Sequence, residues 1–317
     1  MILTLTPNPS VDHTLEVDRL ARGEVLRVDA TRAQAGGKGV NVARALHLAG
    51  VDTRAILPVG GGGGAELTAL LDDLPRLTVP IEGETRANVA VTEADGTTTK
   101  LNAPGPALSP TEADGLLAAL EGELSQRPEW IVASGSLPAG AGEDFYVRVA
   151  GLAAEYGVPL ALDTSGKPLE AAVRAGSLGL LKPNLEELSE LTGTSPSTVG
   201  EVVAAVRELL AQGNGSALVT LGGGGAILVW PEQAWWARGP RVRTRSTVGA
   251  GDCALAGYLT PADSPVDRLR NAVAWGTAAV SLPGTTIPTP DDVRPDAVEV
   301  VTEPDPSWSL DSLAERT

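Results

Sequence analysis

The hydrophobic pattern alternates between two kinds of segment along most of the chain. Short apolar runs with the character of strands are separated by longer stretches in which apolar residues recur at helical spacing. The runs that predict strands are 2–6, 54–59, 130–134, 159–163, 178–182, 217–221 and 226–230, and the stretches that predict helices are 40–49, 66–74, 110–124, 144–156, 185–191 and 199–212. Strands that alternate with helices indicate parallel βαβ units and a layered α/β fold.

The ends of these predicted strands are where a site is expected, because ligands of such folds bind beyond the carboxyl ends of the strands. The residues that fall there are Asp12, Ser134, Asp163, Lys182 and Gly222.

Three segments depart from this rhythm. Residues 15–31 and 85–102 alternate polar and apolar positions, with an Asp-Gly turn in the second, and predict a small sheet outside the main layers. Residues 60–64 are all glycine and predict a flexible loop between a strand and a helix. The residues after 301 are acidic and contain proline, so we expect a loosely ordered tail.

The composition and net charge of the chain make some classes of binding partner unfavourable. The chain has 317 residues and a formal net charge of −16, which disfavours nucleic acid and anionic membranes as partners. An anionic substrate would need a local concentration of positive groups. The single cysteine excludes an intramolecular disulfide. The absence of a signal-type segment and of a membrane-length apolar run predicts a cytoplasmic protein.

The segment Gly249-Ala250-Gly251-Asp252 is the first chemical candidate. Two glycines let successive N–H groups turn toward one point, and the apolar CALAGYL that follows predicts a helix whose N-terminus would bind a phosphoryl group. Asp252 could accept a proton from an attacking hydroxyl. The alternative is an ordinary helix start with Asp252 in its first turn.

A second glycine-rich segment, Gly36-Gly37-Lys38-Gly39-Val40-Asn41, also leads into a predicted helix. Its glycines would let a ligand approach the backbone, and Lys38 and Asn41 would face one side of the first turn. A turn into a helix with Lys38 solvated is the alternative. A Walker A loop is excluded because Gly39 stands where that motif needs Ser or Thr.

Two further segments have both a functional and a structural interpretation. Asn184 and Glu187 lie one helical turn apart and could hold a hydrated Mg²⁺, or they could form a capping box. The glycines that follow Thr220 and Leu221, residues 222–225, could pass under a nucleotide or form a tight hairpin.

The order of these motifs resembles the PfkB/ribokinase family of carbohydrate kinases from Ile2 to about Val300. Both family signatures are present, GGKGVNVARAL at 36–46 and STVGAGDCALAGY at 246–258. The segments LTPNP, ETRAN, NAPGP, SGSLP, KPN and PGT, together with Lys38, are most similar to the 1-phosphofructokinase and tagatose-6-phosphate kinase branch.

The resemblance implies a ribokinase-like three-layer α/β/α core with a mainly parallel sheet and a small β-sheet lid. It implies one kinase domain over residues 1–303, a lid formed by about 13–33 and 84–103, and a C-terminal tail at 304–317. Lids of this family often pair between subunits, so a homodimer is expected. The segment after Tyr258 looks shortened relative to the family's long helix, which puts the nucleotide preference in doubt.

The resemblance also implies a division of roles. Asp252 would be the catalytic base, and Gly249, Ala250 and Gly251 would stabilise the transferring phosphoryl group. The residues expected to bind the sugar phosphate are Asp12, Gly36, Gly37, Lys38, Asn41, Arg86, Asn88, Ser136 and Arg27. Those expected to bind ATP are Lys182, Asn184, Thr220, Gly222, Gly225 and Gly251, while Asn184 and Glu187 would position Mg²⁺ through water.

The resulting hypothesis is ATP- and Mg²⁺-dependent phosphorylation of a ketohexose monophosphate, with fructose 1-phosphate converted to fructose 1,6-bisphosphate. The alternatives within the family are a tagatose-6-phosphate kinase and a 6-phosphofructokinase. Outside it, the alternative is a non-catalytic sugar-phosphate sensor, against which the retention of Asp252 and the Gly249–Gly251 segment argues.

Overall fold

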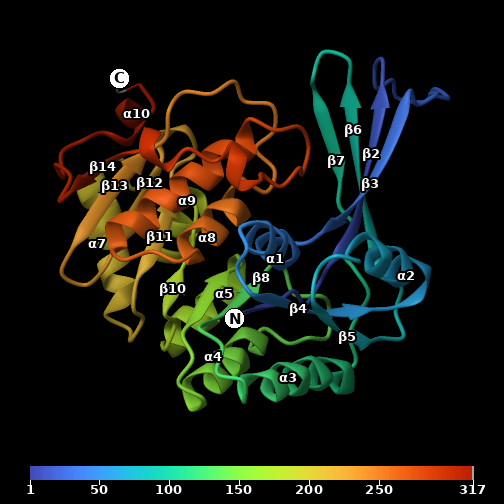
Figure 1. Ribbon diagram of the computed structural model, residues 1–317, viewed down its shortest axis with the longest axis horizontal. Coiled ribbons are helices and arrows are strands. Elements are labelled where there is room, and N and C mark those ends of the chain that lie inside the picture. Colours follow the sequence, from blue (N-terminus) through green and yellow to red (C-terminus); the bar gives the residue numbers. More distant parts are fainter. Residues whose placement is uncertain (316–317) are drawn as a thin grey trace.

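The computed structural model describes residues 1–315. Over these residues, a ten-stranded sheet runs through the main body (Figure 1), with seven neighbouring strands in parallel and three antiparallel strands at one edge. Its strands, in spatial order, are β14 (Glu299–Thr302), β13 (Ala234–Arg238), β12 (Ala226–Val229), β11 (Ala217–Thr220), β10 (Leu180–Leu181), β9 (Leu160–Asp163), β8 (Trp130–Ser134), β1 (Ile2–Leu5), β4 (Thr53–Val59) and β5 (Arg76–Pro80).

Helices cover both faces of this sheet because its central strands are apolar on both sides. Leu3 on β1 and Ile131 on β8 pack with one set of helices, α3 (Pro110–Leu124), α4 (Phe145–Glu155), α5 (Gly166–Ala175), α6 (Leu185–Thr192) and α7 (Val199–Leu210). Ile2 and Val132, one position along, pack with the other set, α1 (Lys38–Leu48), α8 (Ala250–Leu259) and α9 (Pro265–Val280). The expected three-layer α/β/α core is therefore confirmed.

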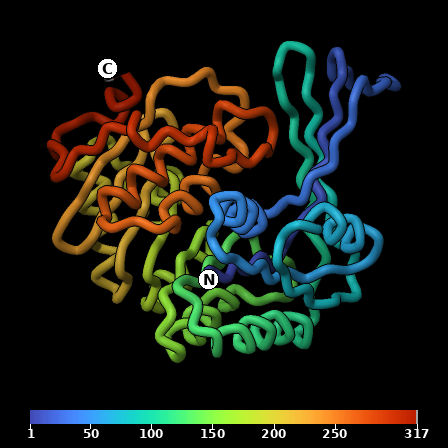
Figure 2. The backbone as a smooth tube through the Cα atoms, in the orientation of Figure 1, coloured from blue at the N-terminus to red at the C-terminus, as the bar shows by residue number. Residues whose placement is uncertain are grey.

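A second sheet projects from the main body as a separate four-stranded blade (Figure 2). Its order is β3 (Ala30–Gly36), β2 (Ser10–Val17), β6 (Arg86–Glu93) and β7 (Thr98–Leu101). Helix α2 (Gly61–Leu70) packs near its base. The predicted small sheet outside the main layers is thus present, although most of the predicted segment 15–31 is the loop between β2 and β3. We call these four strands the lid. Among the described residues, no helix is both long and apolar enough to cross a membrane.

Several local expectations were wrong. The predicted loop at 60–64 is instead the start of α2, because Gly63 N–H donates to Glu84 Oε1 at 2.6 Å and Thr85 N–H donates to the Gly60 carbonyl at 2.9 Å. Glycine is required at the junction, since a Cβ on Gly60 would overlap the Gly83 carbonyl. The strand expected at 178–182 is formed only by Leu180–Leu181.

The segment after Tyr258 contains the turn between two helices. Helix α8 ends at Leu259, and α9 begins at Pro265 after Ser264, whose hydroxyl accepts the Asp267 N–H at 3.1 Å. Helix α9 then runs for 16 residues and packs closely against α8. Pro261 lies in the intervening turn, and Pro265 is the first residue of α9, a position that favours proline.

The residues after 303 are not loose where the structure describes them. The short helix α10 (Leu310–Leu313) buries Leu313 completely, and Arg238 donates a 3.0 Å hydrogen bond to the Leu313 carbonyl. The Val199 N–H, at the start of α7, donates to the Trp308 carbonyl at 3.0 Å. Residues 316–317 of the predicted tail lie outside the described part. The remaining short elements are the 3₁₀ turns η1 (Gly222–Gly224), η2 (Pro290–Asp292) and η3 (Pro295–Ala297).

Candidate active site

A cleft of about 1830 Å³ lies between the lid and the carboxyl ends of the main strands. It is lined by most of the residues singled out from the sequence: Asp12, Gly37, Lys38, Asn41, Arg86, Asn88, Ser136, Lys182, Asn184, Glu187, Thr220, Gly249, Gly251 and Asp252. Those that do not line it are Arg27, Gly36, Ala250, Gly222 and Gly225. The fold therefore gathers residues from both family signatures into one site.

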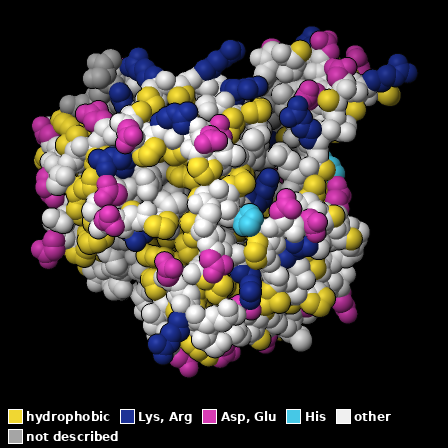
Figure 3. All heavy atoms as spheres, viewed as in Figure 1, with side chains coloured by type: hydrophobic (Ala, Val, Ile, Leu, Met, Phe, Trp, Pro, Cys, Tyr) yellow, Lys and Arg dark blue, Asp and Glu magenta, His cyan; other side chains and the backbone are white. Residues whose placement is uncertain are grey.

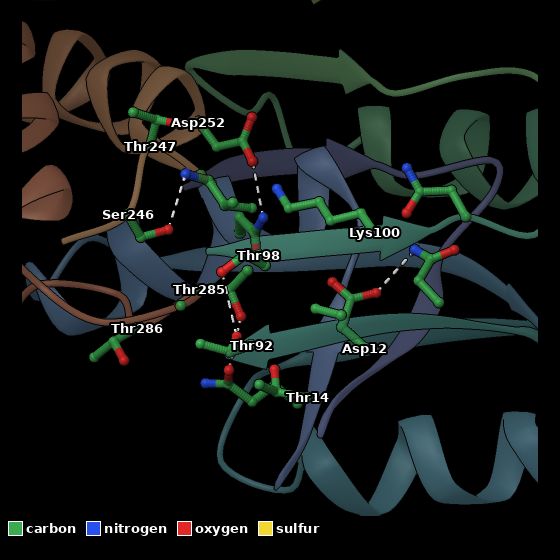
Figure 4. Close-up of a pocket in the computed structure, with 18 of the residues that line it drawn as sticks. Asp12, Thr14, Thr92, Thr98, Lys100, Ser246, Thr247, Asp252, Thr285 and Thr286 are labelled. Atoms are coloured by element: carbon green, nitrogen blue, oxygen red, sulfur yellow. Dashed lines mark hydrogen bonds between the residues drawn. The ribbon is translucent and has the colours of Figure 1, made fainter. Parts of the chain in front are cut away.

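The glycine-rich start of α8 forms one end of this cleft. Gly249 is the N-cap and has a φ of 75°, a conformation that favours glycine. Asp252 follows in the first turn and is buried. Asn41 Nδ2, on α1, donates a 2.8 Å hydrogen bond to Asp252 Oδ2 (Figure 4). The contact brings the two signature segments together and fixes the orientation of the carboxylate.

Asp252 has the electrostatics of a general base. Burial raises its pKa to about 6, with a further contribution from the nearby Asp163, while Asn41, Lys38 and Lys182 oppose the shift. A carboxylate with this pKa is mostly ionised at neutral pH and is a stronger base than an exposed aspartate. The arrangement suits the acceptance of a proton from a hydroxyl group.

A buried charge cluster lies beside this base. Asp163, at the end of β9, is completely buried and pairs with Lys38 Nζ at 2.7 Å and Lys182 Nζ at 3.1 Å. Burial alone would raise the pKa of Asp163, but Lys182 and Lys38 outweigh burial and lower it. A Cβ at Gly251 would lie 3.3 Å from Lys182 Nζ, so this lysine lies close to the start of α8.

Sequence reasoning placed Asp163 at a strand end but gave it no role. Its signal was an acidic residue that ends an otherwise apolar run, and only the fold reveals the two lysines that it holds. Lys38 also lies 3.7 Å from Glu187 Oε1. Despite burial, Asp163 and Glu187 raise the pKa of Lys38, so it remains protonated.

The other end of the cleft holds an arginine that carries a free charge. Arg86 Nη1 donates to the Ala103 carbonyl at 2.7 Å, and Nη2 donates to the Asn8 carbonyl at 2.8 Å. Both partners are neutral backbone groups, so they orient the guanidinium without neutralising it. Burial lowers the pKa of Arg86, and Asp12 partly opposes the shift. Asn8 Nδ2 also donates to Ser136 Oγ at 3.3 Å, which connects the predicted phosphate ligands Arg86 and Ser136.

Asp12 is oriented by its neighbours on the lid. Its Oδ1 accepts hydrogen bonds from Ser10 Oγ at 2.7 Å and from Asn88 Nδ2 at 2.9 Å. Gly36 does not line the cleft but makes room for this carboxylate, since a Cβ there would overlap it. Gly37 has a φ of 118° and packs against Thr6 and Pro9. The glycines thus allow the turn from β3 into α1 to pass close to Asp12.

The expected metal ligands form the capping box that was their structural alternative. Glu187 N–H donates to Asn184 Oδ1 at 2.8 Å, and Asn184 N–H donates to Glu187 Oε2 at 2.9 Å. Both residues line the cleft. Glu187 Oε1 is not used by the cap and points to the Lys38 ammonium. Glu187 can therefore cap the helix through Oε2 and still offer Oε1 to a ligand.

The glycine segment 222–225 packs in the main sheet, and its glycines do not line the cleft. Residues 222–224 form the 3₁₀ turn between β11 and β12, and Thr220 alone of the predicted nucleotide ligands there lines the cleft. A Cβ on Gly225 would overlap the Ala237 carbonyl of β13. The glycine at 225 is explained by strand packing. Arg27 lies in the loop between β2 and β3, outside the cleft lining.

Positive side chains that sequence reasoning missed flank the mouth of the cleft. Arg32 and Lys100 come from the lid, and Arg243 and Arg245 come from the segment that leads to α8. In Figure 3, Lys and Arg side chains lie on both sides of the hollow between lid and body. Acidic side chains such as Asp12, Asp163 and Asp252 line the same cleft, and Arg32 pairs with Glu16 at 3.4 Å. Positive charge for an anionic substrate is therefore offered by individual groups such as Arg86, not by the cleft as a whole.

Comparison with known proteins agrees with the site. The model of the pfkB family carbohydrate kinases matches residues 6–292. The chain is 37% identical to 1-phosphofructokinase of Rhodobacter capsulatus over 92% of this chain and 93% of that protein. It is 36% identical to ATP-dependent 6-phosphofructokinase isozyme 2 of Mycobacterium tuberculosis, over 92% and 88%.

The fold is similar to solved structures of the same kind. A structure of phosphofructokinase-2 from Escherichia coli superimposes with a TM-score of 0.86 at 34% identity, covering 92% of this chain and 96% of that one. The chain therefore belongs to the pfkB family of carbohydrate kinases, phosphotransferases that act on an alcohol group.

Proposed function

We propose that the protein uses ATP to phosphorylate a ketohexose monophosphate, converting fructose 1-phosphate to fructose 1,6-bisphosphate. One observation carries the choice of a sugar phosphate over an unphosphorylated sugar. The Arg86 guanidinium is held in the cleft by two backbone carbonyls and keeps its charge available. Arginine in this setting is suited to bind a phosphate through several N–H donors at once.

In the proposed reaction, Asp252 accepts the proton of the sugar hydroxyl. The hydroxyl oxygen then forms a bond to the γ-phosphorus of ATP, while the bond from that phosphorus to the bridging oxygen breaks and ADP leaves. The N–H groups of Gly249 and Gly251, which line the cleft at the start of α8, stabilise the charge on the transferring group. Asn41 holds the base in position throughout.

Lys38 takes a different part in this scheme from the one expected. The resemblance assigns it to the phosphate already on the sugar, yet its partners are Asp163 and Glu187 rather than Arg86 or Ser136. A protonated lysine between Glu187 and Asp163 supports a role beside the transferring phosphoryl group and ATP. Lys182, held by the same aspartate, complements it. In this scheme Arg86 and Ser136 bind the phosphate of the sugar.

The same residues fit a hydrated Mg²⁺. Across residues 1–315, no group of three or more His, Cys, Asp or Glu side chains is placed to hold a metal ion directly. Mg²⁺ commonly keeps several waters and is shared with nucleotide phosphates, so few protein ligands are needed. Glu187 Oε1, left over from the cap, would bind such a water near Asn184. Bound Mg²⁺ supplies charge neutralisation of the ATP phosphates.

The names of the relatives support a fructose phosphate substrate but differ on which one. Several are named 1-phosphofructokinase, while the M. tuberculosis and E. coli relatives are named ATP-dependent 6-phosphofructokinase isozyme 2. We test the choice by measuring kcat/KM for fructose 1-phosphate, fructose 6-phosphate and tagatose 6-phosphate with ATP. Preference for an unphosphorylated sugar would overturn the sugar-phosphate assignment. Absence of turnover with retained sugar-phosphate binding would favour the sensor.

We further propose that the lid pairs with the lid of a second subunit. Four large hydrophobic side chains are exposed on or beside it, with Val25 98%, Leu101 61%, Val28 43% and Leu20 37% accessible. Large hydrophobic side chains that are exposed on one element support an interface there. One structure of E. coli phosphofructokinase-2 is described as a tetrameric inhibited form, so larger assemblies are known among similar proteins.

A further inference from the structure

The inner face of the lid carries a row of three polar side chains. Asp12 on β2 is paired in register with Gln34 on β3 and with Asn88 on β6. Residues directly opposite each other on neighbouring strands point to the same face of a sheet. All three line the cleft. Gln34 is therefore a polar neighbour of Asp12 in the cleft, and it has no part in the reaction proposed above.

Asp12 uses only one of its oxygens within this row. Ser10 Oγ and Asn88 Nδ2 both donate to Oδ1, at 2.7 and 2.9 Å. Asn88 is itself fixed, because its Oδ1 accepts the Ala103 N–H at 3.1 Å. These contacts hold the carboxylate still and leave Oδ2 as the acceptor available to a substrate hydroxyl.

The orientation of the Gln34 amide is set from outside the lid. Thr285 Oγ1 donates a 2.7 Å hydrogen bond to Gln34 Oε1. Thr285 belongs to the loop that follows α9 and reaches the cleft from the side of the catalytic helix (Figure 4). Because Thr285 occupies the amide oxygen, the Nε2 group of Gln34 has its two N–H donors to offer.

We infer that Gln34 and Asp12 together read the relative configuration of two neighbouring hydroxyl-bearing carbons of the sugar. This inference rests on the proposed ketohexose phosphate substrate. Asp12 Oδ2 accepts a hydrogen bond from one hydroxyl, and Gln34 Nε2 donates to the oxygen of the next. Gln34 is the specificity-determining residue, and Thr285 is the positioning residue that aims its amide.

The chemical consequence is a preference between epimers. Fructose and tagatose differ only in the configuration of one carbon, and inversion there turns its hydroxyl away from a donor placed on the correct side. A site that loses a hydrogen bond in this way rejects the wrong substrate because its own polar group is left unpaired. Removal of the Gln34 amide removes the basis of that rejection.

The experiment compares kcat/KM for fructose 1-phosphate and tagatose 1-phosphate. The variants are Gln34→Ala, Thr285→Val and Thr285→Ser, with Thr286→Val as the matched control. Thr286 lies in the same loop, but its hydroxyl donates to the Pro283 carbonyl at 2.7 Å instead of to the lid. Thermal unfolding of each variant reports folding, and KM for ATP reports the other substrate.

We expect Gln34→Ala to reduce the ratio between the two epimers by about tenfold or more, since a hydrogen-bonding group left unpaired costs at least about that factor. Thr285→Val should reduce it in the same direction, Thr285→Ser should restore it, and Thr286→Val should leave the ratio unchanged. KM for ATP should stay constant in the Gln34 variant.

An equal loss of kcat/KM on both epimers in Gln34→Ala would overturn the inference, as would a failure of Thr285→Ser to restore the ratio. If the wild-type enzyme discriminates between the epimers and Gln34→Ala has the same kcat/KM ratio, this inference is wrong while the proposed function stands. A wild-type enzyme without turnover on either epimer overturns the proposed function, and the inference with it.

Discussion

Asn41 and Asp252 are 211 positions apart in the sequence, yet Asn41 Nδ2 donates a 2.8 Å hydrogen bond to Asp252 Oδ2. Asn41 lies on α1, in the first signature, and Asp252 lies on α8, in the second. The bond favours the ionised carboxylate, while burial and Asp163 disfavour it. The balance leaves the pKa of Asp252 at about 6, and this value makes the activity sensitive to acid.

Turnover should fall as the pH drops through about 6. Burial raises the pKa of Asp252, so the base becomes protonated and inactive below that value. Asp163 cannot account for such a transition, because Lys182 and Lys38 lower its pKa despite burial. A kcat/KM profile between about pH 5 and 8 measures the effect, because kcat/KM reports the pKa values of the free enzyme. Asp252→Asn should lower kcat by several orders of magnitude and remove the transition, and a flat wild-type profile would contradict the assignment.

Asp163→Asn should destabilise the fold strongly. The substitution leaves Lys38 and Lys182 without the carboxylate that they share, and removal of one partner of a buried ion pair costs about 3–5 kcal/mol. Denaturant unfolding measures the loss. Asp114→Asn is the matched control, because its 2.6 Å pair with Arg148 is exposed and contributes about 0–1 kcal/mol.

The pH dependence of stability provides a second check on this cluster. The pKa of Asp163 is lower in the folded protein than its ordinary value, so its contribution is present above that value. The contribution is lost as the pH falls through the lowered pKa. The difference in unfolding free energy between wild type and Asp163→Asn should therefore be largest near neutral pH and shrink in acid. A difference that does not vary with pH would contradict the charged role of Asp163.

The sequence predicted the architecture where local pattern and burial agree. The central strands β1, β8 and β9 are short continuous apolar runs, and buried parallel strands require that pattern. Edge strand β5 is only half-buried and carries no such run, so it was missed. Helix α9 was missed because prolines surround its start, although Ser264 caps it.

The sequence predicted the site residues that lie in recognisable motifs, and it did not predict the others. Gly249 and Asp252 belong to a recognisable segment, and both line the cleft. Asp163 and Gln34 belong to no motif, because their importance depends on partners that come near only in the folded chain. The sequence allowed two interpretations of Glu187, a capping box and a part in Mg²⁺ binding. The structure shows the capping box, and the part in Mg²⁺ binding stays a prediction.

Arg86→Ala should raise KM for the sugar phosphate by about 10- to 100-fold, since a charged hydrogen bond to phosphate contributes about 1.5–3 kcal/mol. KM for ATP should change little. Arg86→Lys is the informative comparison, because a lysine cannot bond to both the Ala103 and Asn8 carbonyls and still present a fork of donors. We expect it to recover only part of the loss. An unchanged sugar KM in Arg86→Ala would remove this residue from the phosphate site.

Leu101→Asp should weaken self-association. Leu101 ends β7, at an edge of the lid, and is 61% exposed, so a charge there would oppose burial against a second lid. Light scattering across a dilution series measures the molar mass. Leu48→Asp is the control, since Leu48 is 43% exposed at the end of α1, away from the lid strands. A monomeric wild type at assay concentration, or equal dissociation in both variants, would argue against the lid interface.

Glu187→Gln separates the two roles of Glu187. The amide oxygen of glutamine can still accept the Asn184 N–H, so the capping box and the stability should largely survive. The lost charge should raise the Mg²⁺ concentration needed for half-maximal activity by several-fold, because Glu187 Oε1 no longer attracts the hydrated ion. Glu201→Gln is the matched control: Glu201 closes the same kind of capping box with Thr198 on α7, and its side chain does not line the cleft. A titration of activity with Mg²⁺, run beside thermal unfolding, should show a shift for Glu187→Gln alone. Equal behaviour of the two variants would mean that Glu187 serves only the helix.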